Sequence, residues 1–178
     1  MKSLMFITGN LNKVKQTQKY CPIPLEHKKL DLIEIQSLDV KEVVEHKVKE
    51  AFRILKKPVL VEDTSLIIND LGKLPGTFIK WFLQEIGVEG ICKLANGTNR
   101  DATTQVLYGF YDGKIIKFFE GKIDGTIATK PRGKNGFGFD SIFIPKGQKK
   151  TQAEMTEEEF DTYNKRRISL EKMGKEFK

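Results

Sequence analysis

Hydrophobic residues change their spacing along the first third of the chain, and the changes predict alternating strands and helices. Three compact apolar runs are typical of short buried strands: residues 3–7, 30–35 and 58–61. Residues 40–56 instead carry apolar side chains at helical spacing, which predicts an amphipathic helix. Residues 12–20 form a polar segment that we predict to be helical, with Asn10 as its N-cap.

The second half of the chain combines short helices with a β-hairpin. Two helices are predicted at residues 77–86 and 88–95, separated at Gly87. Asp112-Gly113 favours a hairpin turn. The strands predicted around and after that turn are residues 103–111, 114–120, 123–129 and 141–144. Thr156, with Glu159 three residues later, forms a capping box that begins a last helix reaching about residue 175. This pattern predicts an α/β chain with a mixed sheet.

The composition fits one folded domain spanning residues 1–178. Hydrophobic residues make up 39% of the chain and charged residues 31%, which excludes a disordered or collagen-like protein. No apolar run approaches the ~20 residues of a membrane helix, and the first seven residues are too short for a secretory signal. We therefore expect a cytoplasmic protein without a membrane partner. Two cysteines and two histidines argue against a disulfide scaffold and against a zinc site: Cys21, Cys92, His27 and His46.

The chain is basic, with 31 Lys and Arg against 24 Asp and Glu, a net charge of +7. A positive balance suits anionic partners such as nucleotides, phosphate or nucleic acid, but it equally serves solubility. The charge is spread along the chain without a polybasic block, and no RNA-binding or zinc-finger motif is present. We therefore do not expect a nucleic-acid partner.

The first candidate site is the turn that follows the first predicted strand. Thr8, Gly9, Asn10 and Lys13 lie where a strand leads through a glycine turn into a helix. Amides at a helix N-terminus favour phosphate, and Lys13 adds a positive charge. The alternative is a capped strand-to-helix turn without a ligand.

The second candidate site is the acidic segment Glu62-Asp63-Thr64, predicted at the end of a buried strand. Ligands of open α/β sheets bind at the carboxyl ends of strands. Adjacent carboxylates there suit Mg²⁺, and one of them could orient or deprotonate an attacking water. Glu34, at the end of another predicted strand, is a possible third carboxylate. The alternatives are an ordinary strand end and an ordinary exposed glutamate.

The third candidate site is the glycine-rich loop at residues 131–140. Gly138 and its neighbouring glycines allow a ligand to approach the backbone closely. Phe137 and Phe139 offer faces for a flat base, and Asp140 offers an acceptor for a ring N–H. The alternative is a structural loop with core phenylalanines.

The fourth group consists of isolated cations on predicted helices. Lys165 and Arg166 could read an exocyclic base oxygen or hold phosphate. Lys47 and Lys80 each lie within a helix of apolar character, and each either extends its ammonium to solvent or points into a site.

Taken in order, these segments resemble the inosine triphosphate pyrophosphatase family, which acts on non-canonical purine nucleoside triphosphates. The resemblance extends over essentially the whole chain. It rests on five motifs in register: the segments at residues 8–13, 61–66, 74–83, 131–140 and 153–155, which are similar to the family's TGNxxK, VEDTxL, LPGPYIKWFL, PRGxxGFGxD and AEM.

The resemblance implies an elongated mixed β-sheet flanked by helices, two lobes with a central cleft, and a homodimer. It also implies Mg²⁺-dependent cleavage of a nucleoside triphosphate into a monophosphate and pyrophosphate. Its site residues fall into three groups. Asp63, Glu62 and Lys13 would be catalytic, and Glu34 and Asp63 would hold the metal. The substrate would contact Thr8, Gly9, Asn10, Lys13, Lys47, Thr64, Lys80, Phe137, Gly138, Phe139, Asp140, Lys165 and Arg166.

The last helix departs from the family's KNxxSHR pattern. An alignment without gaps from Ala153 places Phe160 at the family's Lys and Lys165 at its His, and keeps Arg166. Lys165 and Arg166 could still donate to the O6 of hypoxanthine or xanthine. Adenine has an amino group at this position, which is itself a donor and would leave both side chains without an acceptor. A 6-oxopurine is therefore the expected base. The alternatives are a related pyrophosphatase with altered base specificity and a non-catalytic nucleotide-binding protein.

Overall fold

The computed structural model describes residues 3–177. The strands are β1 (Leu4–Ile7), β2 (Leu25–Lys28), β3 (Val59–Ile68), β4 (Pro75–Gly76), β5 (Asp101–Tyr111), β6 (Ile116–Ile127) and β7 (Phe143–Pro145). The α-helices are α1 (Leu11–Tyr20), α2 (Val40–Leu55), α3 (Ile79–Glu85), α4 (Gly87–Leu94), α5 (Glu157–Thr162) and α6 (Lys165–Glu176). Single 3₁₀ turns lie at Asn69–Leu71 and Gln152–Glu154.

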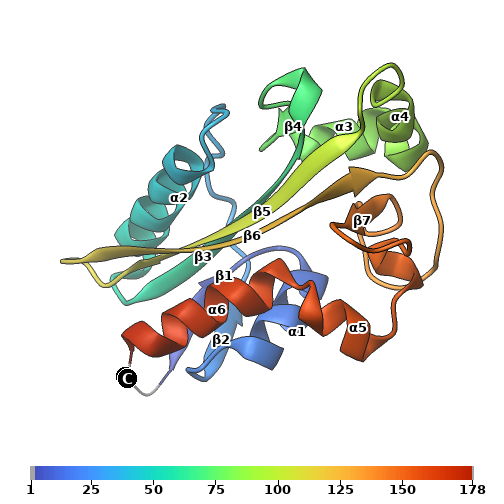
Figure 1. The fold of residues 1–178 in the computed structure, drawn as a ribbon. Helices are drawn as coiled ribbons and strands as arrows, with labels where there is room; N and C mark the ends of the chain where they lie inside the picture. The colour runs from blue at the N-terminus through green and yellow to red at the C-terminus, as the bar shows by residue number, and fades with distance from the viewer. Residues whose placement is uncertain (1–2, 178) are drawn as a thin grey trace. The chain divides into compact units, whose positions relative to one another are not determined.

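The strands form one seven-stranded mixed sheet in the order β2-β1-β3-β5-β6-β7, with β4 paired to β3. β1 is parallel to both β2 and β3, whereas β4 is antiparallel to β3 and β7 is antiparallel to β6. The predicted mixed sheet flanked by helices is therefore confirmed (Figure 1). Within residues 3–177, no helix has the length and apolar composition needed to cross a membrane.

The chain divides into two compact units, and β3, β5 and β6 each contribute to both. Among the described residues, the first unit holds residues 3–64, 106–121 and 165–177. The second unit holds residues 65–105 and 122–164.

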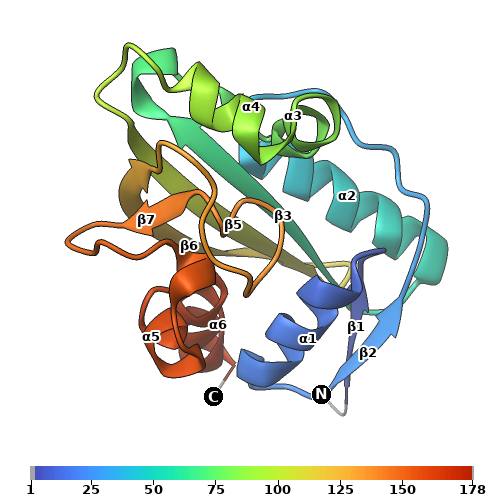
Figure 2. The same cartoon turned by 90° about the vertical axis from the view of Figure 1, so that its right-hand side faces the viewer.

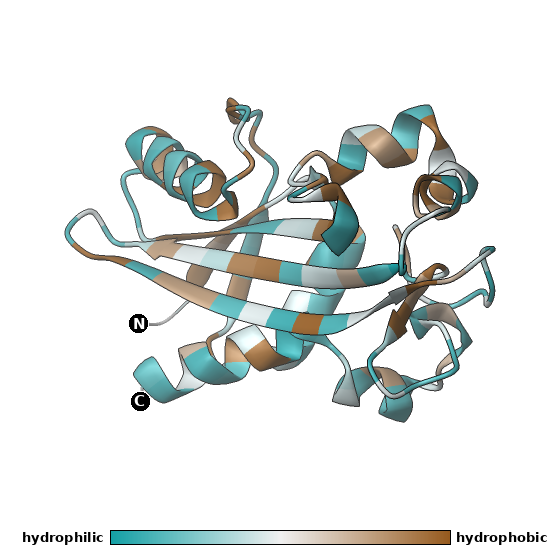
Figure 3. Ribbon diagram, turned by 45° about the horizontal axis from the view of Figure 1, so that its top comes forward, coloured by the Kyte–Doolittle hydropathy of each residue, from teal (hydrophilic) through white to brown (hydrophobic). Residues whose placement is uncertain are grey.

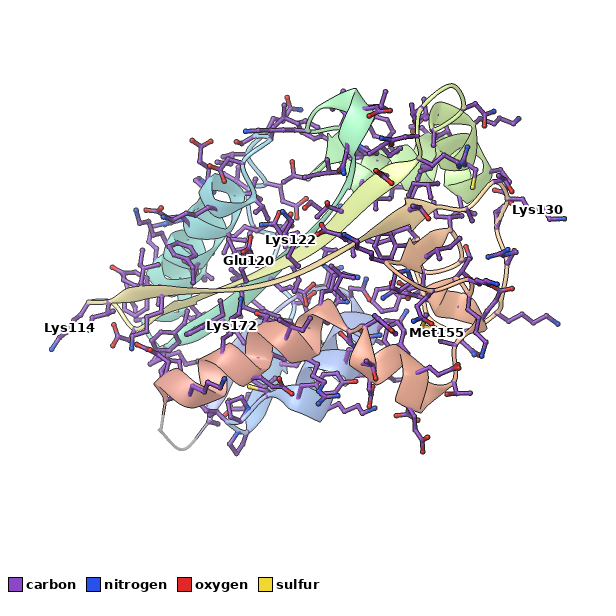
Figure 4. The ribbon with its side chains drawn as sticks, in the orientation of Figure 1. Lys114, Glu120, Lys122, Lys130, Met155 and Lys172 are labelled. Atoms are coloured by element: carbon purple, nitrogen blue, oxygen red, sulfur yellow. The ribbon has the colours of Figure 1, made fainter. Side chains whose placement is uncertain are left out.

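The first unit has helices on both faces of its strands because β1 is apolar throughout and its successive side chains point to opposite faces. Leu4 and Phe6 pack with α1 and α6 in one core cluster, whereas Met5 and Ile7 pack with α2 in another. Figure 1 shows α2 on one side of these strands and α1 with α6 on the other. Figure 3 shows brown apolar bands alternating with paler or teal bands along the long strands. On the edge of this unit, Lys172 Nζ donates to the Glu120 carbonyl over 2.7 Å, and both residues are labelled in Figure 4.

The second unit is built around its own core, to which α3 and α4 contribute Ile79 and Ile91. These two helices follow one another along the chain and lie next to each other (Figure 2). They are separated one residue before the predicted Gly87, because Ile86 lies between them and Gly87, with a φ of 65°, is the first residue of α4. Phe139 and Phe143 complete the core from the side of the glycine-rich loop.

The strand predicted at residues 30–35 is wrong. The strand of this region is β2, which pairs in parallel with β1. Residues 30–35 instead pass alongside α2, where Leu30 and Leu32 pack against the apolar face of that helix. The Ile33 amide donates to the Glu50 carboxylate over 2.8 Å rather than to a neighbouring strand. The apolar residues of this segment therefore serve helix packing.

Four other predicted elements have different limits in the structure. β3 continues through the acidic segment to Ile68, and the predicted strands at residues 114–120 and 123–129 form one strand, β6. The last helix begins at the predicted capping box but ends at Thr162, and α6 starts anew at Lys165. At the break, the Gln152 side-chain amide, from eleven residues earlier in the chain, donates to the Tyr163 carbonyl over 2.8 Å.

Candidate active site

The acidic segment lies beside the turn that follows β1. β1 ends with Ile7 paired to Val61 of the parallel strand β3. Glu62 and Asp63 therefore continue past the end of β1, where the chain after Ile7 turns into α1. We expected the acidic residues at the end of their own strand, and they lie within β3 instead. The carboxyl end that they adjoin is the end of β1.

The turn itself is held by side chains that bond to its backbone. Asn10 caps α1, as predicted, because its Oδ1 accepts from the amides of Asn12 and Lys13 over 3.0 and 3.3 Å. The Thr8 hydroxyl accepts from the Asn10 amide over 3.1 Å. Gly9 and Asn10 are exposed. The capped turn is thus formed as a structural unit, and it places Lys13 on the first turn of α1.

Glu62 is the centre of a buried charge cluster. Its side chain is 0% exposed and makes two 2.8 Å bonds to the Arg166 guanidinium, one to each carboxylate oxygen. Lys13 Nζ lies 3.1 Å from Oε1. The hydroxyls of Thr64 and Tyr108 donate to Oε1 and Oε2 over 3.0 and 2.8 Å. These donors use the lone pairs that a carboxylate offers, so the Glu62 carboxylate bonds only to groups of the protein itself and has no acceptor site left for a ligand.

The surroundings of Glu62 keep it ionised. Burial by itself would raise the pKa of this carboxyl, but the charges of Arg166 and Lys13, with hydrogen bonds from Arg166 and Tyr108, hold the pKa well below its usual range. Burial and the negative charge of Glu62 raise the pKa of the Tyr108 hydroxyl, which therefore keeps the proton that it donates. The cluster of Glu62, Lys13 and Arg166 thus carries a net charge of +1.

Asp63 belongs to a second charged group on the opposite face of β3. Successive side chains of a strand point to opposite faces, and Asp63 points toward α2. Lys47 Nζ on α2 lies 2.9 Å from Asp63 Oδ1 and 2.7 Å from Glu34 Oε1. Burial would lower the pKa of Lys47, but the charge of Asp63 and hydrogen bonds to Glu34 and Asp63 raise it. This group of two carboxylates and one ammonium carries a net charge of −1.

The two adjacent carboxylates do not form a joint metal site. Glu62 is sealed in its cluster, and only Asp63 and Glu34 converge on one cation, the Lys47 ammonium. Among residues 3–177, no group of three or more His, Cys, Asp and Glu side chains is arranged to hold a metal. Mg²⁺ is commonly held by one or two carboxylates together with substrate phosphates. The pair of Glu34 and Asp63 fits that requirement, since both carboxylates already face one positive charge.

The glycine-rich loop lies in the second unit and divides its residues between core and surface. Phe139 is 6% exposed and packs in the core, which is the structural alternative left open by the sequence. Phe137 is half-buried and Gly138 is exposed. The Asp140 carboxylate accepts from the Phe137 amide over 2.8 Å and lies where a side chain at Gly136 would be. Asp140 therefore shapes the loop, and Phe137 is its more accessible ring.

The remaining predicted cations lie in different settings. Lys80 is exposed on α3, with Nζ 5.1 Å from the centroid of the Trp81 ring. Lys165 and Arg166 are each 3% exposed at the start of α6. Arg166 also donates to Gln16 on α1 over 3.0 Å, so its guanidinium joins α1, β3 and α6.

Comparison with known proteins identifies the chain's relatives. The sequence profile of the Ham1 family matches residues 4–176. The chain belongs to the Ham1 family. It is 40% identical over 178 residues to a Schizosaccharomyces pombe protein named inosine triphosphate pyrophosphatase, with 97% of this chain and 94% of that protein covered. It is also 40% identical over 172 residues to a Saccharolobus solfataricus protein named dITP/XTP pyrophosphatase, covering 94% and 90% of the two chains.

The fold agrees with this membership. A solved HAM1 protein structure from Coxiella burnetii superposes with a TM-score of 0.86 at 22% identity, covering 99% of this chain and 98% of that one. The family resemblance predicted from the motifs is confirmed by the profile match and by the 40% identical relatives.

Sequence reasoning missed three polar residues around Glu62 in this Ham1 chain. Tyr108, Thr17 and Gln16 lie outside every motif. Tyr108 sits in an apolar stretch of β5, where a tyrosine resembles any other core aromatic. Its hydroxyl, which needs a partner when buried, is the signal that could have pointed to a polar group nearby.

Proposed function

We propose that the protein is a nucleoside triphosphate pyrophosphatase. It hydrolyses non-canonical purine nucleoside triphosphates (ITP, dITP and XTP) to the monophosphate and pyrophosphate, and so removes them from the nucleotide pool. The proposal is supported by the names of two relatives. Each is 40% identical to this chain over nearly its whole length.

The structural observation that carries the proposal is the convergence of Glu34, Lys47 and Asp63 beside the turn after β1. Glu34 and Asp63 would hold Mg²⁺, which offsets the negative charge of a triphosphate when bound. In the same place Lys47 would neutralise phosphate oxygens, as would Lys13 from the opposite face of β3.

Hydrolysis requires a water at the α-phosphorus and departure of pyrophosphate. Asp63 is our candidate to orient that water and accept its proton, because its carboxylate is partly accessible, at 14% side-chain exposure. The bond between the α-phosphorus and the bridging oxygen breaks as the water oxygen attaches. Thr8, Gly9, Asn10 and Lys13 would hold the phosphate chain. Glu62, which we expected to be catalytic, would act by positioning Lys13, since its own carboxylate is fully enclosed.

The family resemblance implies one contribution to base recognition from the glycine-rich loop of the second unit and a separate one from the start of α6 in the first unit. The half-buried Phe137 would stack on the purine, while Phe139 and Asp140 hold the loop in shape. Lys80 would contribute charge to substrate binding. Lys165 would donate to O6 of a 6-oxopurine, and Arg166 would support it from the Glu62 cluster.

A hydrolysis panel tests the proposal. Purified protein is incubated with Mg²⁺ and ITP, XTP, dITP, GTP, ATP or dUTP, and monophosphate and pyrophosphate are measured. Turnover of ITP and XTP well above that of GTP and ATP is expected. Pyrophosphate from a different triphosphate would mean that Phe160 and Lys165 have changed the base specificity. Binding without turnover of any substrate would contradict the enzymatic proposal.

Two variants and one control test the roles given to Asp63 and Lys165. Asp63→Asn should abolish turnover without unfolding the protein, whereas Asp31→Asn, an exposed aspartate of the same unit, should retain it. Full activity of Asp63→Asn would overturn the role given to Asp63. Lys165→His should shift selectivity further toward ITP if Lys165 stands in for the family's histidine. The proposal also includes a cytoplasmic homodimer, and sedimentation analysis tests the dimer.

A further inference from the structure

Tyr108 is a fully buried polar residue that no motif includes. Its ring packs in the core between β-strands and α1, in contact with Phe6. Its hydroxyl donates to Glu62 Oε2 over 2.8 Å and lies 2.7 Å from the hydroxyl of Thr17 on α1. A tyrosine hydroxyl has one proton, and Tyr108 donates it in the hydrogen bond to Glu62, so the Thr17 hydroxyl is the donor in the other bond.

These bonds form a directed chain that begins and ends on the same helix. Thr17 on α1 donates to Tyr108, Tyr108 donates to Glu62, and Glu62 holds the ammonium of Lys13, one turn earlier on α1. Each member polarises the next in a medium of low dielectric constant. Together with the Arg166 guanidinium and the Thr64 hydroxyl, Tyr108 thus holds the orientation of Glu62, against which the Lys13 ammonium is placed.

Lys13 is the member of this cluster that reaches solvent. Its side chain is 20% exposed, whereas those of Glu62 and Arg166 are 0% and 4% exposed. An ammonium has three donors, and Glu62 takes one of them. With the cluster's surplus of one positive charge, Lys13 is suited to hold an anion beside the Thr8–Gly9 turn.

We propose that Tyr108 is a positioning residue for phosphate binding: through Glu62 it fixes the ammonium of Lys13 where the triphosphate chain of the substrate lies. The inference rests on the proposed function. It assigns Tyr108 no contact with substrate. Its effect is to help Arg166, which bonds both carboxylate oxygens, keep Glu62 turned so that Oε1 faces Lys13 and Oε2 faces Tyr108.

The first test removes one oxygen atom. Tyr108→Phe keeps the ring and deletes the hydroxyl, and it should raise KM for the best triphosphate of the panel about tenfold with kcat nearly unchanged. Tyr111→Phe is the matched control, because Tyr111 lies three residues along the same strand and packs on Phe52. The control should change neither constant.

The second test asks whether Tyr108 acts through Lys13. Lys13→Met should raise KM by itself, and adding Tyr108→Phe should then have little further effect. Equal effects of Tyr108→Phe with and without Lys13 would overturn the inference, as would an unchanged KM in Tyr108→Phe. Thr17→Val, which removes the donor to Tyr108 at nearly constant volume, provides the same readout if Tyr108→Phe does not fold.

The outcome for the wild type separates this inference from the proposed function. A wild type that turns over no triphosphate contradicts the proposed function. An active wild type with an unaltered KM in Tyr108→Phe, or in Thr17→Val where Tyr108→Phe does not fold, contradicts the positioning role alone. Thermal unfolding of each variant distinguishes a displaced Lys13 from a loosened core, since a general loss of packing would lower kcat and the melting temperature together.

Discussion

The ion pair between Glu62 and Arg166 should be among the most strongly coupled pairs in the first unit. Arg166→Met removes two 2.8 Å charge-assisted bonds and leaves a carboxylate that is 0% exposed. Breaking a buried pair from one side costs about 3–5 kcal/mol. Lys13, 3.1 Å from Oε1, offsets part of this loss, so we expect about 3 kcal/mol. Glu62→Gln, which leaves Arg166 buried beside a neutral amide, should cost a similar amount.

The free energy of unfolding of the double variant, Arg166→Met with Glu62→Gln, gives the coupling energy of the pair. Once one partner is gone, removing the other should cost little, so the two losses should not add, and a coupling energy of about 2–3 kcal/mol is expected. Urea unfolding at neutral pH measures all four proteins. Arg167→Met is the control, because Arg167 pairs with Glu171 on the exposed side of the same helix, and its loss should stay below about 0.5 kcal/mol. Losses of the two single variants that simply add in the double variant would refute the coupling.

Three further predictions concern stability. The folded-state pKa of Glu62 lies below its unfolded value of about 4.3, so its contribution to the free energy of unfolding is complete above that pH and is lost as the pH falls below it. Between about pH 5 and pH 3, the urea midpoint of Glu62→Gln should therefore fall less than that of the wild type. Gly174→Ala should stabilise α6 by about 1 kcal/mol in thermal unfolding, since the nearest atom to the new methyl group is a Pro22 carbon 3.5 Å away; a destabilised variant would contradict this. Gly121→Ala should destabilise by about 3 kcal/mol or more in the same assay, because its Cβ would lie 1.8 Å from the Lys165 carbonyl oxygen, and a neutral result would show that β6 and α6 can separate.

The elements that could be predicted from sequence are those whose signals are local. The α2 helix carries its apolar face within its own residues and its N-cap, Asp39, directly before them, and Asn10 caps α1 by bonding two and three residues ahead. The strand predicted at residues 30–35 is wrong because an apolar run packs equally well against a strand or a helix, and the sequence does not indicate which of the two it contacts. The strand that pairs with β1 is β2, and the apolar run packs on α2 instead. The break at Tyr163 depends on Gln152, eleven residues earlier, and no local pattern encodes that contact.

The site was predictable in its residue types and less so in its geometry. Glu34, Lys47 and Asp63 were each selected from sequence, and the structure brings them together. Glu62 was grouped with Asp63 because the two are adjacent, but adjacency on a strand separates side chains to opposite faces. The burial of Glu62 and its bonds to Tyr108 and Arg166 come from segments 46 and 104 residues away, and they emerge only in the folded chain.

The alternation of Glu62 and Asp63 along β3 also determines which changes of chain length the protein can accept. Deleting one residue between Val59 and Val61 would exchange the faces of the two carboxylates. Asp63 would then face Arg166, and Glu62 would face Lys47. The apolar side chains of the strand that now pack in the core would at the same time point to the other face. Residues 29–37, which pair with no strand, have no such register to lose. Among descendants of this sequence, insertions and deletions should therefore accumulate in that connection and be absent from the strand a few residues away, even where individual side chains of the strand have been replaced.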